Sequence, residues 1–283
     1  MKERIGIFGG GFKPFTTGHF AKLANAIRDN DQVYLFYGIQ EPKPKEFYKT
    51  TRKGRWAKGE EKPDKRLRSI GDTGRFYTPE LSREIFNIYE EAIQQNFGNS
   101  VTVESTMGST PLRRIFDVVQ EFAENPELYE KITIYGDGDT LKDYLLPYNR
   151  KYFKNQSGTV DLLDTGKVQL GSIKPESSAD YLDLERLEAL IGSSEKSATE
   201  ALSSYYPGAS PEEISQMQSV RGTEVRSKAS ARETASEAEK FLPPFLNTQQ
   251  KRRVINLLSA ATEKSPTQNE EFLRAFVRGV IKG

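Results

Sequence analysis

The sequence predicts an α/β fold in which a parallel five-stranded sheet carries helices on both faces. Short apolar segments alternate with helical segments through residue 171, and the helical ones place apolar residues three and four positions apart. Glycine or polar residues follow each apolar segment, as expected where strands end. Alternation of this kind produces right-handed crossovers and a ligand crevice at the carboxyl ends of the strands.

The first three predicted elements are a strand, a helix and a second strand. Residues 5–8 form the first strand, and residues 33–37 form the second. Thr17 or Gly18 is expected to cap the intervening helix. The apolar face of that helix comprises Phe20, Leu23, Ala24 and Ile27.

The next helix is predicted over residues 79–96, because Thr78 can cap it, Pro79 suits its first turn and Gly98 can end it. A strand at 101–104 follows. Thr110, with Pro111 behind it, then marks the start of another helix.

A fourth strand is predicted at residues 132–135. The fifth lies between residues 160 and 170, where VDLLD and KVQLG both fit and the pattern does not separate them.

Composition excludes several classes of chemistry. The 283 residues contain no cysteine, which excludes disulfides, thiolate metal sites and cysteine nucleophiles. The net charge of +1 indicates neither a nucleic-acid partner nor an anionic membrane. No apolar segment approaches the length of a membrane span, and the first strand begins without a signal peptide, so we expect a cytoplasmic protein.

A glycine-rich turn, GIFGGGFKPFTTGH, links the first strand to the first helix and ends at His19, the only histidine. Gly9, Gly10 and Gly11 lack side chains, so their main-chain N–H groups can approach an anion closely. The positive end of the following helix faces the same space. The turn therefore predicts a phosphate site, although a single histidine beside an apolar helix face could also be a packed or capping residue.

The residue pattern of this turn distinguishes it from other phosphate-binding loops. A GxGxxG pattern laid from Gly9 reaches Pro14 where its third glycine belongs, and there is no GxxxxGK[ST] loop here. The pattern GxFxPxTxGH instead resembles the signature of the HxGH nucleotidylyltransferase superfamily, in its TxGH variant. It is also similar to the cytidylyltransferase-like proteins of bacteriophages.

A second motif lies in VRGTEVRSKA, which is similar to the ISGTxxR element of the same superfamily. Thr223 is expected to cap a helix and Arg226 to lie one turn further on, so both could reach one phosphate group. Val220 and Arg221 depart from the Ile and Ser of the pattern. Taken alone, GTEVR also fits an ordinary helix start.

The fourth strand runs into GDGDTL, which resembles the GxDxL element of mononucleotide adenylyltransferases. Asp139, or else Asp137, could hold a ribose hydroxyl, the acceptor or a hydrated magnesium ion. The same residues are also typical of a simple turn.

The resemblance extends to TPELSREIFNIY, STPLRRIFDVV and EKFLPPFLN, and it implies a Rossmann-like core at residues 1–171. Residues 40–75 are a basic insertion, interpreted as a lid, a nucleic-acid contact or a solvated loop. Residues 172–219 are a Ser- and Glu-rich helical insertion, with one amphipathic helix formed around Leu184 and Leu187. Residues 220–246 carry the second motif, and 247–283 are predicted as two tail helices that dock on the core or form an oligomer interface.

The function implied by the resemblance is transfer of a nucleoside monophosphate from ATP or CTP to a small, phosphorylated acceptor, with release of pyrophosphate. Mg²⁺, held mainly by nucleotide and water, is the implied cofactor. The implied catalytic residues are His19, Thr16 and Lys13. The implied nucleotide-binding residues are Phe8, Gly9, Gly10, Gly11, Phe12, Gly18, Gly136, Asp139, Thr223 and Arg226.

One alternative is a non-catalytic binding or assembly module on the same fold, such as a phage virion component. In that case the partners would be virion proteins or further copies of the chain, in the host cytoplasm or the particle. A relative of the aminoacyl-tRNA synthetases is a more distant alternative, because no KMSKS-like loop is visible.

Overall fold

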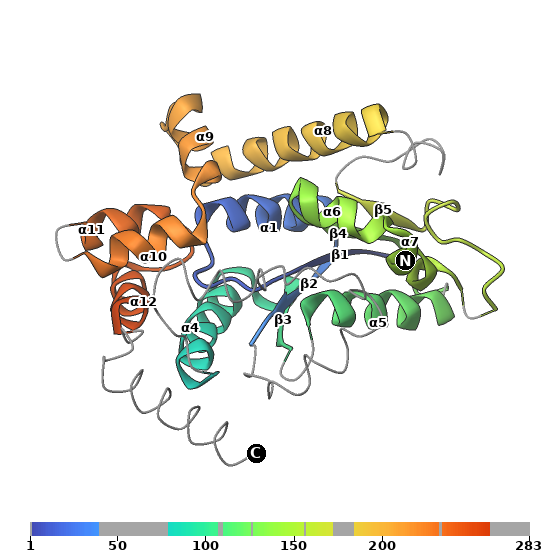
Figure 1. Ribbon diagram of the computed structural model, residues 1–283, viewed down its shortest axis with the longest axis horizontal. Helices are drawn as coiled ribbons and strands as arrows, with labels where there is room; N and C mark the ends of the chain where they lie inside the picture. Colours follow the sequence, from blue (N-terminus) through green and yellow to red (C-terminus); the bar gives the residue numbers. More distant parts are fainter. Residues whose placement is uncertain are drawn as a thin grey trace, which may run out of the picture.

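The protein is described from a computed structural model of the full chain (Figure 1). The description covers residues 2–39, 79–106, 110–125, 127–155, 157–171, 184–231 and 234–260. The basic insertion at 40–75, the expected cap Thr78 and the second predicted tail helix lie outside these ranges.

A five-stranded parallel sheet in the order β3-β2-β1-β4-β5 forms the centre, which confirms the predicted α/β fold. The strands are β1 (Glu3–Gly10), β2 (Gln32–Tyr37), β3 (Val101–Ser105), β4 (Tyr129–Tyr135) and β5 (Val168–Leu170). β1 lies in the middle, between β2 and β4. This order places the end of β1 at the centre of the carboxyl edge, beside the point where successive strands change from one side of β1 to the other.

The side chains of β1 alternate between two hydrophobic cores, one on each face of the sheet. Ile5 and Ile7 contribute to one core, whereas Phe8 contributes to the other. Because both faces are covered, the central strands are apolar over most of their length.

The first face is covered by α1 (Thr17–Asp29) and α4 (Pro79–Phe97). Further helices pack on the outside of these two, and Figure 1 shows α8 lying along α1 while α10, α11 and α12 gather beyond its start. These outer elements are α8 (Leu184–Ser203), α9 (Pro211–Ser219), α10 (Gly222–Ser230), α11 (Ala235–Ala238), η4 (Glu239–Phe241) and α12 (Thr248–Ala260).

The second face is covered by α5 (Pro111–Glu124) together with a group of short elements. The short elements are α6 (Gly138–Leu145), α7 (Pro147–Arg150) and η2 (Lys151–Phe153). The remaining element, η1 (Gly98–Ser100), connects α4 to β3. No helix in the described residues has the length and apolar character needed to span a membrane.

Most predicted boundaries agree with the structure, and the differences have local causes. Thr110 caps α5 by accepting a hydrogen bond from the main-chain N–H of Arg113, as predicted. Gly98 follows α4 with a φ of 56°, which favours glycine. The predicted cap of α1 was wrong, because Thr16 takes this position and Thr17 is the first helical residue.

The fifth strand is formed by the KVQLG segment alone, as β5. The VDLLD segment forms turns instead. The Asp161 carboxylate accepts hydrogen bonds from the Arg150 side chain and from the main-chain N–H of Leu163, and these bonds hold the turn.

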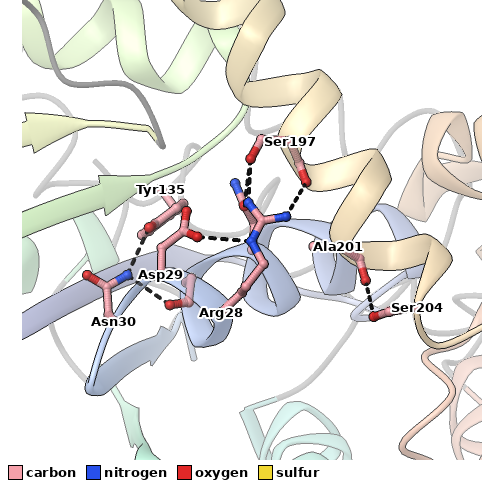
Figure 2. A network of polar contacts seen from close by, with 9 residues as sticks. Arg28, Asp29, Asn30, Tyr135, Ser197, Ala201 and Ser204 are labelled. Atoms are coloured by element: carbon pink, nitrogen blue, oxygen red, sulfur yellow. Dashed lines mark hydrogen bonds and ion pairs between the residues drawn. The ribbon is translucent and has the colours of Figure 1, made fainter.

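Polar contacts join α8 to α1 on the side of α1 away from the sheet (Figure 2). Arg28 of α1 donates to the hydroxyl and the carbonyl oxygen of Ser197 in α8. The Ser197 hydroxyl donates in turn to Asn25 Oδ1 over 3.0 Å. Asn30, at the end of α1, donates to the Tyr135 hydroxyl of β4 over 2.8 Å, which ties the helix to the sheet.

Replacement of Ser197 by alanine is expected to lower the free energy of unfolding by about 1–2 kcal/mol, because Asn25 and Arg28 would each lose a partner. Chemical denaturation would measure the change. Ser193→Ala, at an exposed position of the same helix, is the matched control. Equal stability of the two variants would contradict the role given to Ser197.

Candidate functional site

The predicted site residues converge at the carboxyl edge of the sheet. β1 ends at Gly10 and leads into the turn 11–16, and β4 ends at Tyr135 and leads to Asp137. The main-chain N–H of Gly38, after β2, donates to the carbonyl oxygen of Gly10 over 2.9 Å. The turn that was predicted to bind phosphate therefore lies at the carboxyl edge of the sheet, at the end of its central strand.

The three consecutive glycines have different roles. A β-carbon at Gly9 would lie 2.9 Å from Ile115 Cδ1, so this glycine allows α5 to pack closely against β1. A β-carbon at Gly10 would lie 2.6 Å from the ring of Phe12. Gly11 is exposed and has open space around its Cα, so it is the glycine whose main chain a ligand could approach.

Two buried aromatic rings support His19. Phe12 adopts a φ of 31°, uncommon for a bulky residue, and its ring meets the imidazole edge-on at a centroid distance of 5.1 Å. The ring of Phe15 lies 5.6 Å from the imidazole centroid. Phe8 and Phe12 are both buried, so only their main chains are placed to meet a ligand.

Tyr89 of α4 fixes the main chain of the turn, a role that the sequence analysis missed. Its hydroxyl accepts from the N–H of Phe15 at 3.2 Å and donates to the carbonyl oxygen of Phe15 at 3.3 Å. The signal in the sequence was a tyrosine within an otherwise apolar stripe, because a buried hydroxyl needs a partner.

Thr16 and His19 form a capping box at the start of α1. The Thr16 hydroxyl accepts from the main-chain N–H of His19 at 3.4 Å. The main-chain N–H of Thr16 donates to His19 Nδ1 at 2.9 Å. Thr16 is only 1% exposed, so its side chain contacts His19 and not the open side of the turn.

The environment keeps the imidazole neutral. Burial lowers the pKa of His19 from 6.5 to about 4; the negative charge of Asp137 opposes this shift and the positive charge of Lys22 adds to it. His19 remains partly exposed despite this environment. At neutral pH the ring is therefore uncharged.

The second motif meets the glycine-rich turn. Arg226 of α10 donates through Nη1 to the carbonyl oxygen of Lys13, which lies 213 positions earlier in the chain. A β-carbon at Gly222 would lie 3.5 Å from the same oxygen. The first turn of α10 is thus seated directly on residues 13–14, which are joined by a cis peptide bond.

Within α10, Arg226 occupies the predicted position but Thr223 does not. The helix is capped at Arg221, whose side chain forms no capping bond, so the expected cap at Thr223 is wrong. Thr223 is exposed in the first turn of α10. Its hydroxyl is therefore accessible to a ligand without serving as the cap.

Positive charge accumulates where these segments meet. Burial and the nearby charge of Arg226 lower the pKa of Lys13 to about 8. Lys22 is 7% exposed and forms an ion pair with Glu195 of α8, which offsets its charge. Lys13 and Arg226 thus bring two cationic side chains together at this edge.

Gly18 makes the approach of α9 possible. A β-carbon at this position would overlap the carbonyl oxygen of Gln218, so only glycine fits beside the end of α9. The Gln218 side chain donates to Glu195 Oε2 over 3.1 Å, which links α9 to the ion pair of Lys22. Gly18, predicted to bind nucleotide, here positions the chain that leads to Arg226.

The GDGD segment starts α6. Asp137 is exposed and accepts from the main-chain N–H of Thr140 over 2.8 Å. Gly136 is buried, and a β-carbon there would crowd Thr140 at 3.2 Å. Asp139 lies in the first turn of α6, with its side chain outside the described part. The charge of Asp137 acts on His19.

These groups can bind an anion and stabilise negative charge. They comprise a neutral imidazole, two cations and an accessible glycine main chain beside the start of a helix. Within the described residues no three His, Cys, Asp or Glu side chains gather as a metal cluster.

No protein-family model matches the chain, and a search of curated proteins finds no significant match. Among solved structures, the chain is similar to the nicotinic acid mononucleotide adenylyltransferase of Plasmodium falciparum complexed with APC. That match has 10% identity and a TM-score of 0.47, and covers 92% of this chain and 97% of the other. The same enzyme complexed with NaAD matches with 10% identity and a TM-score of 0.45, covering 92% and 98%.

Gly18→Ala is expected to destabilise the protein by about 1–3 kcal/mol, because the added methyl group must displace the end of α9. Gly192→Ala is the matched control: it lies in α8 with open space around its Cα, and should be neutral or stabilising. Thermal unfolding would compare the two. Similar melting temperatures would show that α9 does not lie against Gly18.

Proposed function

We propose that the protein is a nucleotidyltransferase that transfers a nucleoside monophosphate from ATP or CTP to a small, phosphorylated acceptor and releases pyrophosphate. The observation that carries the proposal is the hydrogen bond from Arg226 to the carbonyl oxygen of Lys13. It joins two motifs, each compatible with phosphate binding, into one basic edge next to the only histidine.

In the proposed reaction the acceptor attacks the α-phosphorus in line, and no covalent protein intermediate is needed. His19 donates a hydrogen bond to an α- or β-phosphate oxygen as negative charge develops. Lys13, Arg226 and Thr223 hold the β- and γ-phosphates. Thr16 acts on this chemistry through His19, because its own side chain is buried.

Mg²⁺ bound to the nucleotide supplies charge neutralisation on the triphosphate. The donor set fits this arrangement, because Asp137 provides one exposed carboxylate near His19 while phosphate oxygens and water supply the other ligands. Asp137 would hold the hydrated ion through water.

His19→Asn and Arg226→Gln are each expected to weaken binding of MgATP or MgCTP at least about tenfold, because asparagine has no N–H at the position of the imidazole Nε2 and glutamine lacks the charge of the guanidinium. His19→Asn should also slow pyrophosphate release by roughly 10²- to 10³-fold. Isothermal calorimetry and a pyrophosphate assay would measure both effects. Arg253→Gln, exposed on α12, is the control.

Absence of any His19-dependent nucleotide binding would refute the proposal. Co-sedimentation of the protein with phage particles, without pyrophosphate release on any acceptor, would favour the assembly module instead.

The lowered pKa of Lys13 predicts that the protein takes up protons when it binds nucleotide. The pKa of about 8 in the free protein leaves Lys13 largely neutral above pH 8, and a bound phosphate raises that pKa again. Binding at pH 8.5 should therefore take up part of a proton, and binding at pH 7 almost none from this group. Calorimetry in buffers of different ionisation enthalpy measures this uptake.

Lys13→Met should abolish the uptake at pH 8.5, whereas Lys196→Met, on the exposed side of α8, should leave it unchanged. Uptake that persists in Lys13→Met would show that another group titrates.

A further inference from the structure

The capping box at the start of α1 has an unusual member. Its third helical residue is ordinarily Glu or Gln, whose side-chain oxygen accepts from the main-chain N–H of the cap. Here His19 occupies that position, and its Nδ1 accepts from the N–H of Thr16 at 2.9 Å. A ring nitrogen has taken the place of the oxygen.

This contact determines which ring nitrogen carries the proton. A main-chain N–H is a fixed donor, so the atom that it meets must offer a lone pair. A neutral imidazole with its lone pair on Nδ1 carries hydrogen on Nε2. The Thr16 hydroxyl, 2.9 Å from Nδ1, is compatible with this state because it can also donate. In the other tautomer, or in the cation, two N–H donors would face each other.

We propose that Thr16 is a positioning residue whose main-chain N–H holds His19 as the Nε2–H tautomer, so that the site offers phosphate a neutral N–H donor. The identity of the ligand rests on the proposed function, but the state of the ring does not. The donor is ready before the nucleotide arrives, and no proton has to be taken up by the ring to form it.

The surroundings of the ring act in the same direction. Phe12 and Phe15 contact the imidazole, which restricts its rotation. A half-turn of the ring would replace Nδ1 by a carbon atom and leave the Thr16 N–H without its acceptor. Burial opposes protonation, as the low pKa of His19 indicates. The ring should thus stay neutral and in one orientation from pH 5.5 to 8, well above a pKa of about 4.

The test is a long-range ¹H–¹⁵N correlation spectrum of the ¹⁵N-labelled full chain. Because the chain has a single histidine, one imidazole pattern reports the state without ambiguity. We expect a pyrrole-type Nε2 and a pyridine-type Nδ1, unchanged from pH 5.5 to 8. An Nδ1–H pattern, an averaged mixture of tautomers, or a cationic ring near pH 6.5 would overturn the inference.

Variants at position 16 separate the main chain from the side chain. Thr16→Val keeps the N–H and removes the hydroxyl, so the Nε2–H pattern should persist, as it should in Thr16→Ser. Loss of the pattern in Thr16→Val would assign the effect to the hydroxyl and overturn the main-chain mechanism. Thr16→Pro removes the N–H, so a folded variant should show an averaged mixture of tautomers in place of one fixed Nε2–H pattern. Should this variant not fold, the wild-type and valine spectra still decide.

Nucleotide binding is measured on the same samples, which keeps the two proposals apart. An Nε2–H ring in a protein that binds no nucleotide would uphold this inference and refute the proposed function. Nucleotide binding with a cationic or Nδ1–H ring would do the reverse. The affinity for MgATP or MgCTP should not depend on the protonation of His19. Its pH dependence near pH 6.5 should therefore be the same in the wild type and in His19→Asn.

Discussion

The start of α1 is the constraint on which the rest of the site depends. Within four residues, Thr16 closes the capping box, Gly18 admits the end of α9, and His19 presents its ring. These three contacts restrict one another, because the orientation of α1 that allows Thr16 to cap it must also leave room for Gln218 beside Gly18. The aromatic rings of Phe12 and Phe15 support this arrangement from inside the core. The position of the imidazole is therefore set by packing and main-chain bonds together.

The outer helices complete the basic edge as well as covering the core. The ion pair of Lys22 with Glu195 and the bonds of Arg28 to Ser197 hold α8 along α1, and Gln218 connects α8 to α9. The chain then passes directly into α10, which delivers Arg226. A segment that looked in the sequence like an insertion thus carries the scaffold for the second half of the site.

Local signals made the first half of the site predictable from the sequence. A strand followed by glycines, a cap and a helix specify one another within about 15 residues, so the place of His19 at the sheet edge followed from short-range rules. The meeting of Lys13 and Arg226 was suggested only by resemblance between motifs, because no local rule relates residues so far apart. Cap positions failed by one or two residues where neighbouring residues were both suitable, as with Thr16 and Thr17. The collision that Gly18 avoids depends on a tertiary contact that no periodicity reveals.

The distance in sequence between Lys13 and Arg226 has a consequence for how the molecule forms. All five strands lie before residue 171, so the sheet can be complete while α8, α9 and α10 are still undocked. Closing a loop of more than two hundred residues is entropically costly and slow compared with pairing of neighbouring elements. During synthesis the ribosome must also release residue 226 before the guanidinium can reach the Lys13 carbonyl. The basic edge is thus a late product of folding, assembled only after the sheet beneath it already exists.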